Sequence, residues 1–132
     1  MSTRPKLEVT ITSLEMLERP PWDATPFPTG AKIQHCPHAS ISFYRHLYNS
    51  VGQPWLWYER RAWSDEQISQ VIHSENIEIH VLYQDEKPAG FVELEQQIQG
   101  DNSLHVEISY FGLLPAFIGR GLGKSFLEWS II

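Results

Sequence analysis

The chain has 132 residues, of which 42% are apolar, and a formal net charge of −6. That size suits a single domain that buries roughly two-thirds of its surface. The net negative charge argues against nucleic acid as a partner and favours a neutral or cationic small molecule. No apolar run approaches the roughly 18 residues of a membrane span, and no basic-then-apolar leader is present, so we expect neither a membrane segment nor a signal peptide. The single Cys36 suits a reducing cytoplasm.

The first part of the chain reads as a strand followed by a long loop. Leu7, Val9 and Ile11 alternate with polar residues, which predicts a strand. Five of the nine prolines fall between Pro20 and Pro37, which predicts a loop without regular structure.

That loop contains His35, Cys36 and His38, which resemble a set of metal ligands. Three donors in four residues cannot easily surround one tetrahedral ion, and no second cluster accompanies them. His80 and His105 fall on predicted strand faces, with no spacing that suggests a joint site. We therefore expect an ordinary loop and no metal site.

Two helices follow. Ser40 can cap a helix that ends at Gly52, with an apolar face made of Tyr44, Leu47, Tyr48 and Val51. Ser64 and Gln67 have the spacing of a capping box and predict a short second helix, with an apolar face made of Ile68, Val71 and Ile72.

Three strands come next. Apolar residues alternate over 77–83, a turn is predicted at 85–88, and a further strand over 89–94 completes a hairpin. Residues 101–102 predict another turn, and alternation over 104–110 predicts the strand that enters a glycine-rich stretch. The predicted order is strand, two helices, three strands and a final helix.

The glycine-rich stretch carries Gly119, Gly121 and Gly123 at alternate positions, with Arg120 and Lys124 beside them. Glycine lets the backbone approach a ligand closely, and the N–H groups at the start of the following helix favour an anion. The two cations add attraction for phosphate. The pattern predicts a phosphate-binding loop.

Two nucleotide-binding patterns fit this loop poorly. The pattern G-x-x-x-x-G-K-[ST] fits at Gly123, Lys124 and Ser125, but its first glycine would fall on Ile118. The dinucleotide pattern G-x-G-x-x-G fails because Lys124 stands where its last glycine is required.

The stretch resembles the acetyl-CoA loop of the GNAT N-acetyltransferases, Q/R-x-x-G-x-G/A, which follows a hydrophobic strand. In the family form V-x-P-x-x-R-G-x-G-x-G, Leu113 takes the valine place and Pro115 the proline place. Ile118 departs from the pattern, since the family has Gln or Arg there. The resemblance implies an α+β domain with a GNAT-like mixed sheet flanked by helices. The chain ends at Ile132 in the helix after the loop, so we expect residues 1–132 to form the N-terminal part of that fold, incomplete at the C-terminus.

By this resemblance, the protein is expected to be an N-acetyltransferase that moves an acetyl group from acetyl-CoA to a primary amine by direct attack on the thioester. The acceptor would be a small molecule or a peptide, with no nucleic acid or membrane partner, and a homodimer is compatible with the open sheet edge. A non-catalytic acyl-CoA-binding or partner-binding module of the same fold is the alternative.

A bulge is expected at Gly112. The residues implied to bind the cofactor are Phe111, Gly112, Leu113, Leu114, Ile118, Gly119, Arg120, Gly121, Leu122, Gly123 and Lys124.

The resemblance also implies a general base at Glu107, whose spacing to the glycine loop matches the glutamate of the histone-acetylating branch. Alternation places Glu107 on one face with Phe111, and Tyr110 in the core with Ile108. The alternative is that Glu107 is an ordinary surface residue, in which case Glu93 is the reserve candidate. The usual general acid would lie beyond the last residue.

A tryptophan-rich segment occupies the place where GNAT proteins form the wall of the acceptor site. Trp55 and Trp57, with Glu59 nearby, could hold a cationic amine through cation–π contacts. The alternative is that these rings pin the loop between the helices onto the sheet.

Overall fold

The structure is a computed structural model that describes residues 16, 26–55, 57–58, 60–98, 100 and 104–131. The predicted strand at 7–11 and the predicted turn at 101–102 lie outside these residues. Two short 3₁₀ turns, Gln53–Trp55 and Pro115–Phe117, accompany the main elements. Those are β1 Ala31–His35, α1 Ile41–Gly52, α2 Asp65–Ile72, β2 Ile77–Gln84, β3 Lys87–Ile98, β4 Leu104–Leu113 and α3 Leu122–Ile131.

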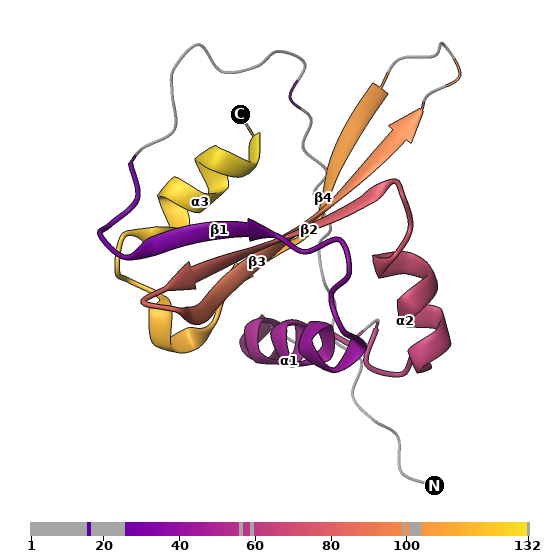
Figure 1. The fold of residues 1–132 in the computed structure, drawn as a ribbon, viewed down its shortest axis with the longest axis horizontal. Coiled ribbons are helices and arrows are strands. Elements are labelled where there is room, and N and C mark those ends of the chain that lie inside the picture. The colour runs from indigo at the N-terminus through magenta and orange to yellow at the C-terminus, as the bar shows by residue number, and fades with distance from the viewer. Residues whose placement is uncertain are drawn as a thin grey trace, which may run out of the picture.

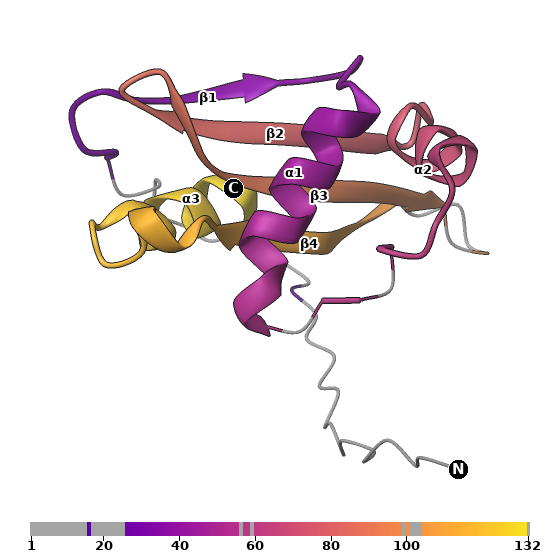
Figure 2. The ribbon, with the colours of Figure 1, turned by 90° about the horizontal axis from the view of Figure 1, so that it is seen from below.

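The strands form one sheet in the order β1-β2-β3-β4, and every pairing among the described residues is antiparallel. Helices α1 and α2 cover one face of the sheet and α3 covers the other (Figure 1). Helix α1 crosses the strands at a steep angle (Figure 2). Each face has its own apolar core: Phe91 and Val81 pack beneath α1 and α2, whereas Leu82 and Val92 pack beneath α3.

The prediction of a loop from Pro20 to Pro37 is wrong in part, because β1 lies inside it. The prolines flank the strand, and none falls between Ala31 and His35. Each of these five residues lies opposite a residue of β2, so the strand joins the sheet without a proline interrupting the ladder. The prolines on both sides of this short strand led to the prediction of a loop.

Both predicted helix starts are confirmed. The hydroxyl of Ser40 accepts a hydrogen bond from the Phe43 N–H at 3.2 Å. Ser64 and Gln67 form the reciprocal capping box, with distances of 3.2 and 2.9 Å. The predicted hairpin is also confirmed, with Asp85 and Glu86 both at positive φ, as a two-residue turn between twisted strands requires.

The register of β3 and β4 shifts once. Glu93 lies opposite Tyr110, but Leu94 lies opposite Ile108, so Ser109 is an extra residue in β4. The bulge expected at Gly112 is therefore found at Ser109. It reverses the alternation of side chains, so that Ile108 packs on the α3 side and Tyr110 on the α1 side.

Within the described ranges, no helix combines the length and the apolar character that crossing a bilayer demands.

Gly112 marks the point where α1 touches β4, because a Cβ there would collide with Cγ1 of Val51. We expect Gly112→Ala to lower the free energy of unfolding by about 1–3 kcal/mol through overpacking, as measured by urea denaturation. Gly123→Ala is the matched control. Its Cβ would meet Leu113 Cδ1 at an ordinary 3.5 Å, and alanine favours a helix by up to about 1 kcal/mol. Equal stability of the two variants would contradict this account.

Candidate functional site

The glycine loop joins the end of β4 to α3 and has an open backbone. Gly119 and Gly121 have φ values of 83° and 78°, a left-handed conformation that favours glycine. No heavy atom lies within 4 Å of a Cβ built on either residue, so both face open space. Left-handed residues placed in this way turn successive N–H groups into a concave anion site.

The start of α3 adds further donors. The N–H groups of Leu122, Gly123 and Lys124 lie in the first helical turn and have no partner within the helix. The Arg120 guanidinium lies 5.3 Å from the Phe117 ring centroid. The Lys124 side chain is 76% exposed, and its Nζ lies 4.0 Å from Oε1 of Glu128. One loop and the helical turn that follows it therefore carry backbone donors, the positive end of a helix dipole and two cationic residues, which suits a phosphate or pyrophosphate.

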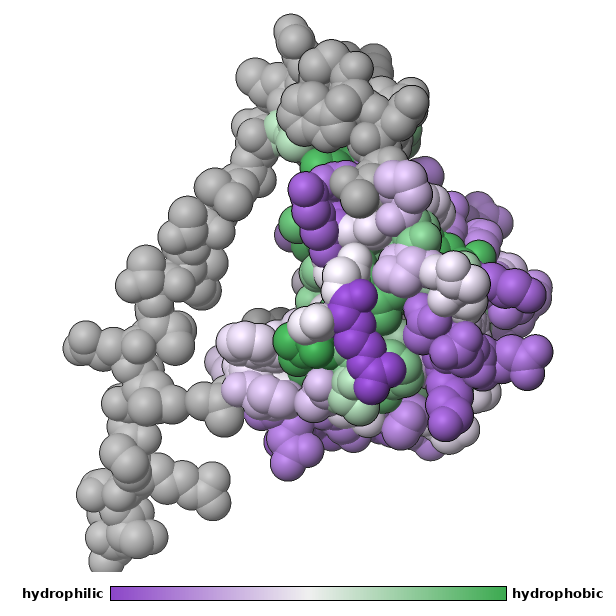
Figure 3. Space-filling model, turned by 90° about the vertical axis from the view of Figure 1, so that its left-hand side faces the viewer, coloured by the Kyte–Doolittle hydropathy of each residue, from purple (hydrophilic) through white to green (hydrophobic). Residues whose placement is uncertain are grey.

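The end of the molecule that carries this loop is shown in Figure 3, where apolar surface lies among polar side chains. The Leu122 side chain is fully buried in the core under α3, and Ile118 is 52% exposed. A ligand at the loop would thus meet the backbone of Leu122, but both the side chain and the backbone of Ile118.

The outer edge of β4 continues this surface. The Leu114 N–H donates to the Ala89 carbonyl at 2.8 Å, so these two residues form a hydrogen-bonded pair. Because such pairs alternate along an antiparallel ladder, Phe111 and Leu113 turn their N–H and C=O groups away from β3. No strand among the described residues pairs with this edge. Of the four strand residues predicted to bind the cofactor, Phe111 and Leu113 offer backbone groups, whereas Gly112 and Leu114 direct theirs toward β3.

A buried charge cluster lies on the α1 side of the sheet. Glu93 is fully buried, and its Oε1 accepts hydrogen bonds from Arg60 Nη1 at 2.5 Å and from the Tyr44 hydroxyl at 2.8 Å. Arg60 also donates to the Tyr44 hydroxyl, and its guanidinium lies 4.5 Å from the Tyr110 ring centroid. The second oxygen of Glu93 has no hydrogen-bond partner among the described residues.

The cluster shifts the pKa values of Tyr44 and Arg60. Burial, followed by the charge of Glu93, raises the pKa of Tyr44 well above its ordinary value. Burial is the largest single effect on the pKa of Arg60 and would lower it, but the hydrogen bonds and charge interactions with Glu93 and Tyr44 together outweigh burial and raise the pKa. Arg60 is thus a permanent cation held by Glu93, whose carboxylate is already engaged.

Sequence reasoning missed Arg60 and Tyr44, although a signal was present. A glutamate inside an apolar strand requires a buried partner, and Arg60 stands in the aromatic segment that the chain folds back onto this strand. Which cation would pair with Glu93 could not be read from the sequence, because 33 residues separate it from Arg60.

Glu107 lies exposed on β4, directly opposite Glu95 on β3. Its Oε2 accepts a hydrogen bond from Gln97 Nε2 at 2.9 Å. The predicted face of Glu107 is wrong, because the bulge at Ser109 places it on the α1 side with Tyr110, not with Phe111. Tyr110 packs against the α1-side core as expected, but on the opposite face from Ile108.

The tryptophans divide into packed and exposed residues. Trp57 packs against Tyr48 and Tyr110, with ring centroids 5.5 and 5.0 Å away. This arrangement matches the interpretation that the ring pins the loop onto the sheet. Trp55 is 65% exposed. Glu59 lies outside the described residues.

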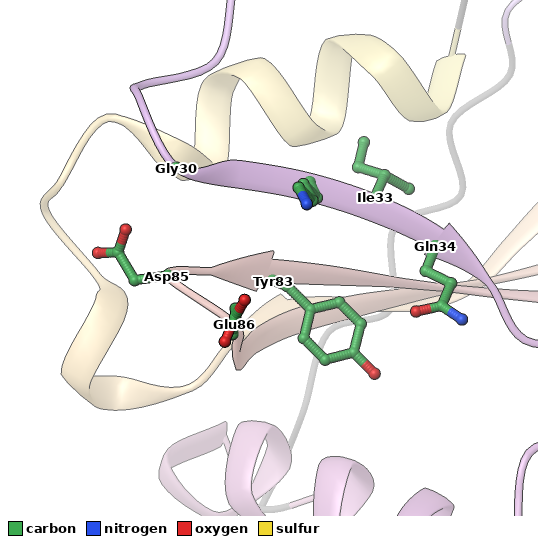
Figure 4. A pocket seen from close by; sticks show the side chains of 7 residues that line it. Gly30, Ile33, Gln34, Tyr83, Asp85 and Glu86 are labelled. Carbon is green, nitrogen blue, oxygen red and sulfur yellow. The ribbon is translucent and has the colours of Figure 1, made fainter.

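A cavity of about 840 Å³ lies elsewhere, beside β1 and the β2–β3 turn (Figure 4). Its lining includes Lys32, Tyr83 and the carboxylates of Asp85 and Glu86. None of the residues predicted to bind the cofactor or to act as a base lines it. The cavity is therefore separate from the loop–edge surface formed by the glycine loop and the outer edge of β4.

The profile of the Acetyltransferase (GNAT) family matches residues 41–131, which include both helices on the α1 side, β2 to β4, the glycine loop and α3. The chain belongs to the GNAT family of acetyltransferases. No curated protein matches the chain.

Solved structures share the fold at low identity. An aminoglycoside acetyltransferase from an uncultured soil metagenomic sample, solved with trehalose, is 13% identical with a TM-score of 0.64, over 76% of this chain and 67% of that one. A GNAT family acetyltransferase of Staphylococcus aureus is 12% identical with a TM-score of 0.61, over 77% and 76%. A glucosamine N-acetyltransferase region of a fungal multi-domain β-N-acetylglucosaminidase is 15% identical with a TM-score of 0.58, over 84% and 13%.

The GNAT fold is at odds with the two nucleotide-binding patterns. Ser125, which would have to reach a nucleotide-bound cation, is buried and donates to the Pro26 carbonyl at 3.2 Å. Both patterns also need a parallel βαβ unit, whereas β4 and its described neighbour are antiparallel.

Removing Arg60 should reveal how strongly the buried charge cluster stabilises the domain. Arg60→Met leaves Glu93 buried without a counter-charge, so we expect the free energy of unfolding to fall by about 3–5 kcal/mol. Adding Glu93→Gln should restore a large part of it. Lys124→Met is the control: its ammonium is exposed and lies 4.0 Å from Glu128, so its loss should change stability by less than about 1 kcal/mol. Urea denaturation of all four proteins would measure this, and equal effects of the two single Met variants would contradict it.

Proposed function

We propose that this GNAT protein is an acetyl-CoA-dependent N-acetyltransferase acting on a cationic primary amine. The observation that carries the proposal is the glycine loop, where Gly119 and Gly121 leave open backbone beside the unpaired first turn of α3. The pyrophosphate of acetyl-CoA would bind there, near Arg120 and Lys124.

The rest of the cofactor would follow the outer edge of β4. Phe111 and Leu113 turn backbone groups toward that side, and an extended amide chain can pair with them as an added strand would. Acetyl-CoA would supply the acetyl group as a reactive thioester. The bulge at Ser109 lies next in line, and bulges frequently stand beside active sites because they redirect a backbone group.

The acceptor is inferred from charge. Glu95 and Glu107 lie opposite one another on the α1 side, and both remain free of the Arg60 pairing that engages Glu93. Two adjacent carboxylates attract a cation, which favours an ammonium over a neutral hydroxyl. The exposed ring of Trp55 remains a candidate for a cation–π contact with the same group.

The reaction balances as a direct transfer. The ammonium gives a first proton to Glu107, the freed amine forms the N–C bond, the C–S bond breaks, and the thiolate takes up the second proton that the nitrogen loses as it becomes an amide. A covalent acyl-enzyme on cysteine is not favoured, since burial raises the pKa of Cys36, the single cysteine of the chain, and keeps it as a thiol. Glu93 is the weaker base candidate, because its carboxylate already accepts two hydrogen bonds.

Calorimetry with acetyl-CoA, CoA and ATP tests the class of ligand, and thiol release with a panel of amines that includes sisomicin tests the reaction. Sisomicin is chosen because a structure of similar fold was solved with it. We expect binding of both CoA compounds, no binding of ATP, and amine-dependent thiol release. CoA binding without thiol release for any amine would identify a binding module.

The glycine loop should be sensitive to any side chain. Gly121→Val introduces a branched residue at positive φ where the pyrophosphate must approach, so we expect acetyl-CoA affinity to fall at least tenfold, about 1.4 kcal/mol. Gly100→Val is the control, because a Cβ there also meets no heavy atom within 4 Å, and it should leave affinity unchanged. Unaltered affinity in a folded Gly121→Val protein would remove this loop as the site.

Glu107→Gln preserves size and the contact with Gln97 but removes the base. We expect kcat to fall by about 10² to 10⁴ at neutral pH, with acetyl-CoA affinity nearly unchanged. Raising the pH should recover part of the loss, because the amine then deprotonates unaided. Glu95→Gln is the control and should affect KM more than kcat. If the Glu107→Gln enzyme keeps the wild-type kcat between about pH 6 and 9, Glu107 has a structural role and is not the general base.

A further inference from the structure

Two histidines and a glutamate meet on the α3 side of the sheet, at the end of β1. His35 lies directly opposite His80 on β2, and their rings stack with centroids 4.6 Å apart. Glu78 lies two residues before His80 on the same strand, so its side chain emerges on the same face. No metal site was expected from the sequence, because three donors in four residues cannot easily surround one ion and the spacing of His80 suggested no joint site.

The ligand atoms of these three residues converge. Nε2 of His35 and Nε2 of His80 lie 4.0 and 3.9 Å from the same oxygen, Oε1 of Glu78. Each residue offers an atom within 4.8 Å of those of the other two. Among the described residues, no hydrogen bond joins the three side chains, and the two Nε2 atoms lie only at the outer limit of ion-pairing distance from the carboxylate.

Helix α3 contacts this cluster through Trp129, whose ring centroid lies 5.0 Å from that of His80 and which brings no charge. The arrangement leaves one carboxylate oxygen and two imidazole nitrogens within 4.8 Å of one another.

We propose that His35, Glu78 and His80 bind one divalent transition-metal ion, with Zn²⁺ as the representative case. Imidazole and carboxylate are ligands that zinc accepts at about 2.0–2.2 Å, which corresponds to donor atoms roughly 3.4 Å apart in a tetrahedral site. The separations of 3.9 and 4.0 Å from the carboxylate oxygen, with all three ligand atoms within 4.8 Å of one another, need side-chain movements of about 1 Å or less. Mg²⁺ and Ca²⁺ do not fit, because they require oxygen ligands.

The site is open enough to complete its coordination. The side chains of His35 and Glu78 are 44% and 36% exposed, so water can take the fourth position, whereas His80 is only 14% exposed. A bound ion would cross-link the end of the edge strand β1 to β2 and hold the ring on which Trp129 packs. It would act on stability, because none of its ligands belongs to the glycine loop or to β4.

The test uses the whole chain without an affinity tag. Titration calorimetry with ZnCl₂ should show one ion per chain, and CoCl₂ should give the visible absorption of a four-coordinate site. We expect His80→Asn and His35→Asn each to weaken Zn²⁺ binding at least tenfold. His105→Asn removes an exposed histidine on β4 and should leave binding unchanged. Absence of saturable one-to-one binding, or equal losses in His105→Asn and His80→Asn, would overturn the proposal.

Glu78→Gln protects the test against misfolding of the histidine variants, since this glutamate is partly exposed. We expect its melting temperature without metal to match that of the wild type. Zn²⁺ should raise the melting temperature of the wild type, because a ligand that binds only the folded state stabilises it. It should not raise that of Glu78→Gln. An equal rise in both proteins would place the ion elsewhere and overturn the proposal.

Discussion

The ion pair between Glu93 and Arg60 is the constraint on which the arrangement around the sheet depends. Glu93 sits on β3, between two layers of helices, where a charge without a partner would be strongly destabilising. Arg60 and Tyr44 reach it from two other segments, so three distant parts of the chain must come together for the domain to fold. The aromatic rings around Arg60 exclude water from the pair and give the cation further contacts.

The same pair divides the acidic side chains of this face into two groups. The charge of Glu93 is paired with Arg60 and stabilises the fold, whereas Glu95 and Glu107 lie outside this pair and can interact with a ligand. The bulge at Ser109 makes this division relevant to the candidate chemistry, because it turns Glu107 to the α1 side and keeps Phe111 on the α3 side. One inserted residue thus separates a candidate base from the residues that pack beneath α3.

The glycine loop depends on backbone conformation and not on packing. A Cβ built on Gly119 or Gly121 would meet no heavy atom within 4 Å. The free N–H groups at the start of α3 are present at the N-terminus of any helix. The helix itself is anchored elsewhere, through buried Leu122 and Phe126 and through the Ser125 hydroxyl. A rigid helix can in this way present an open loop at its end.

The sequence by itself determined the elements whose causes are local. The caps at Ser40 and Ser64, the hairpin turn at Asp85 and the glycine loop follow from side-chain and backbone chemistry within a few residues, and the family follows from that loop and the order of elements. Only the tertiary structure decided what depends on pairing between distant residues. β1 exists because β2 supplies its hydrogen bonds, the face of Glu107 follows from its register against β3, and Arg60 meets Glu93, as His35 meets His80, only after the sheet has formed. Local preferences carry no information about register, because one residue of slip reverses every face of a strand.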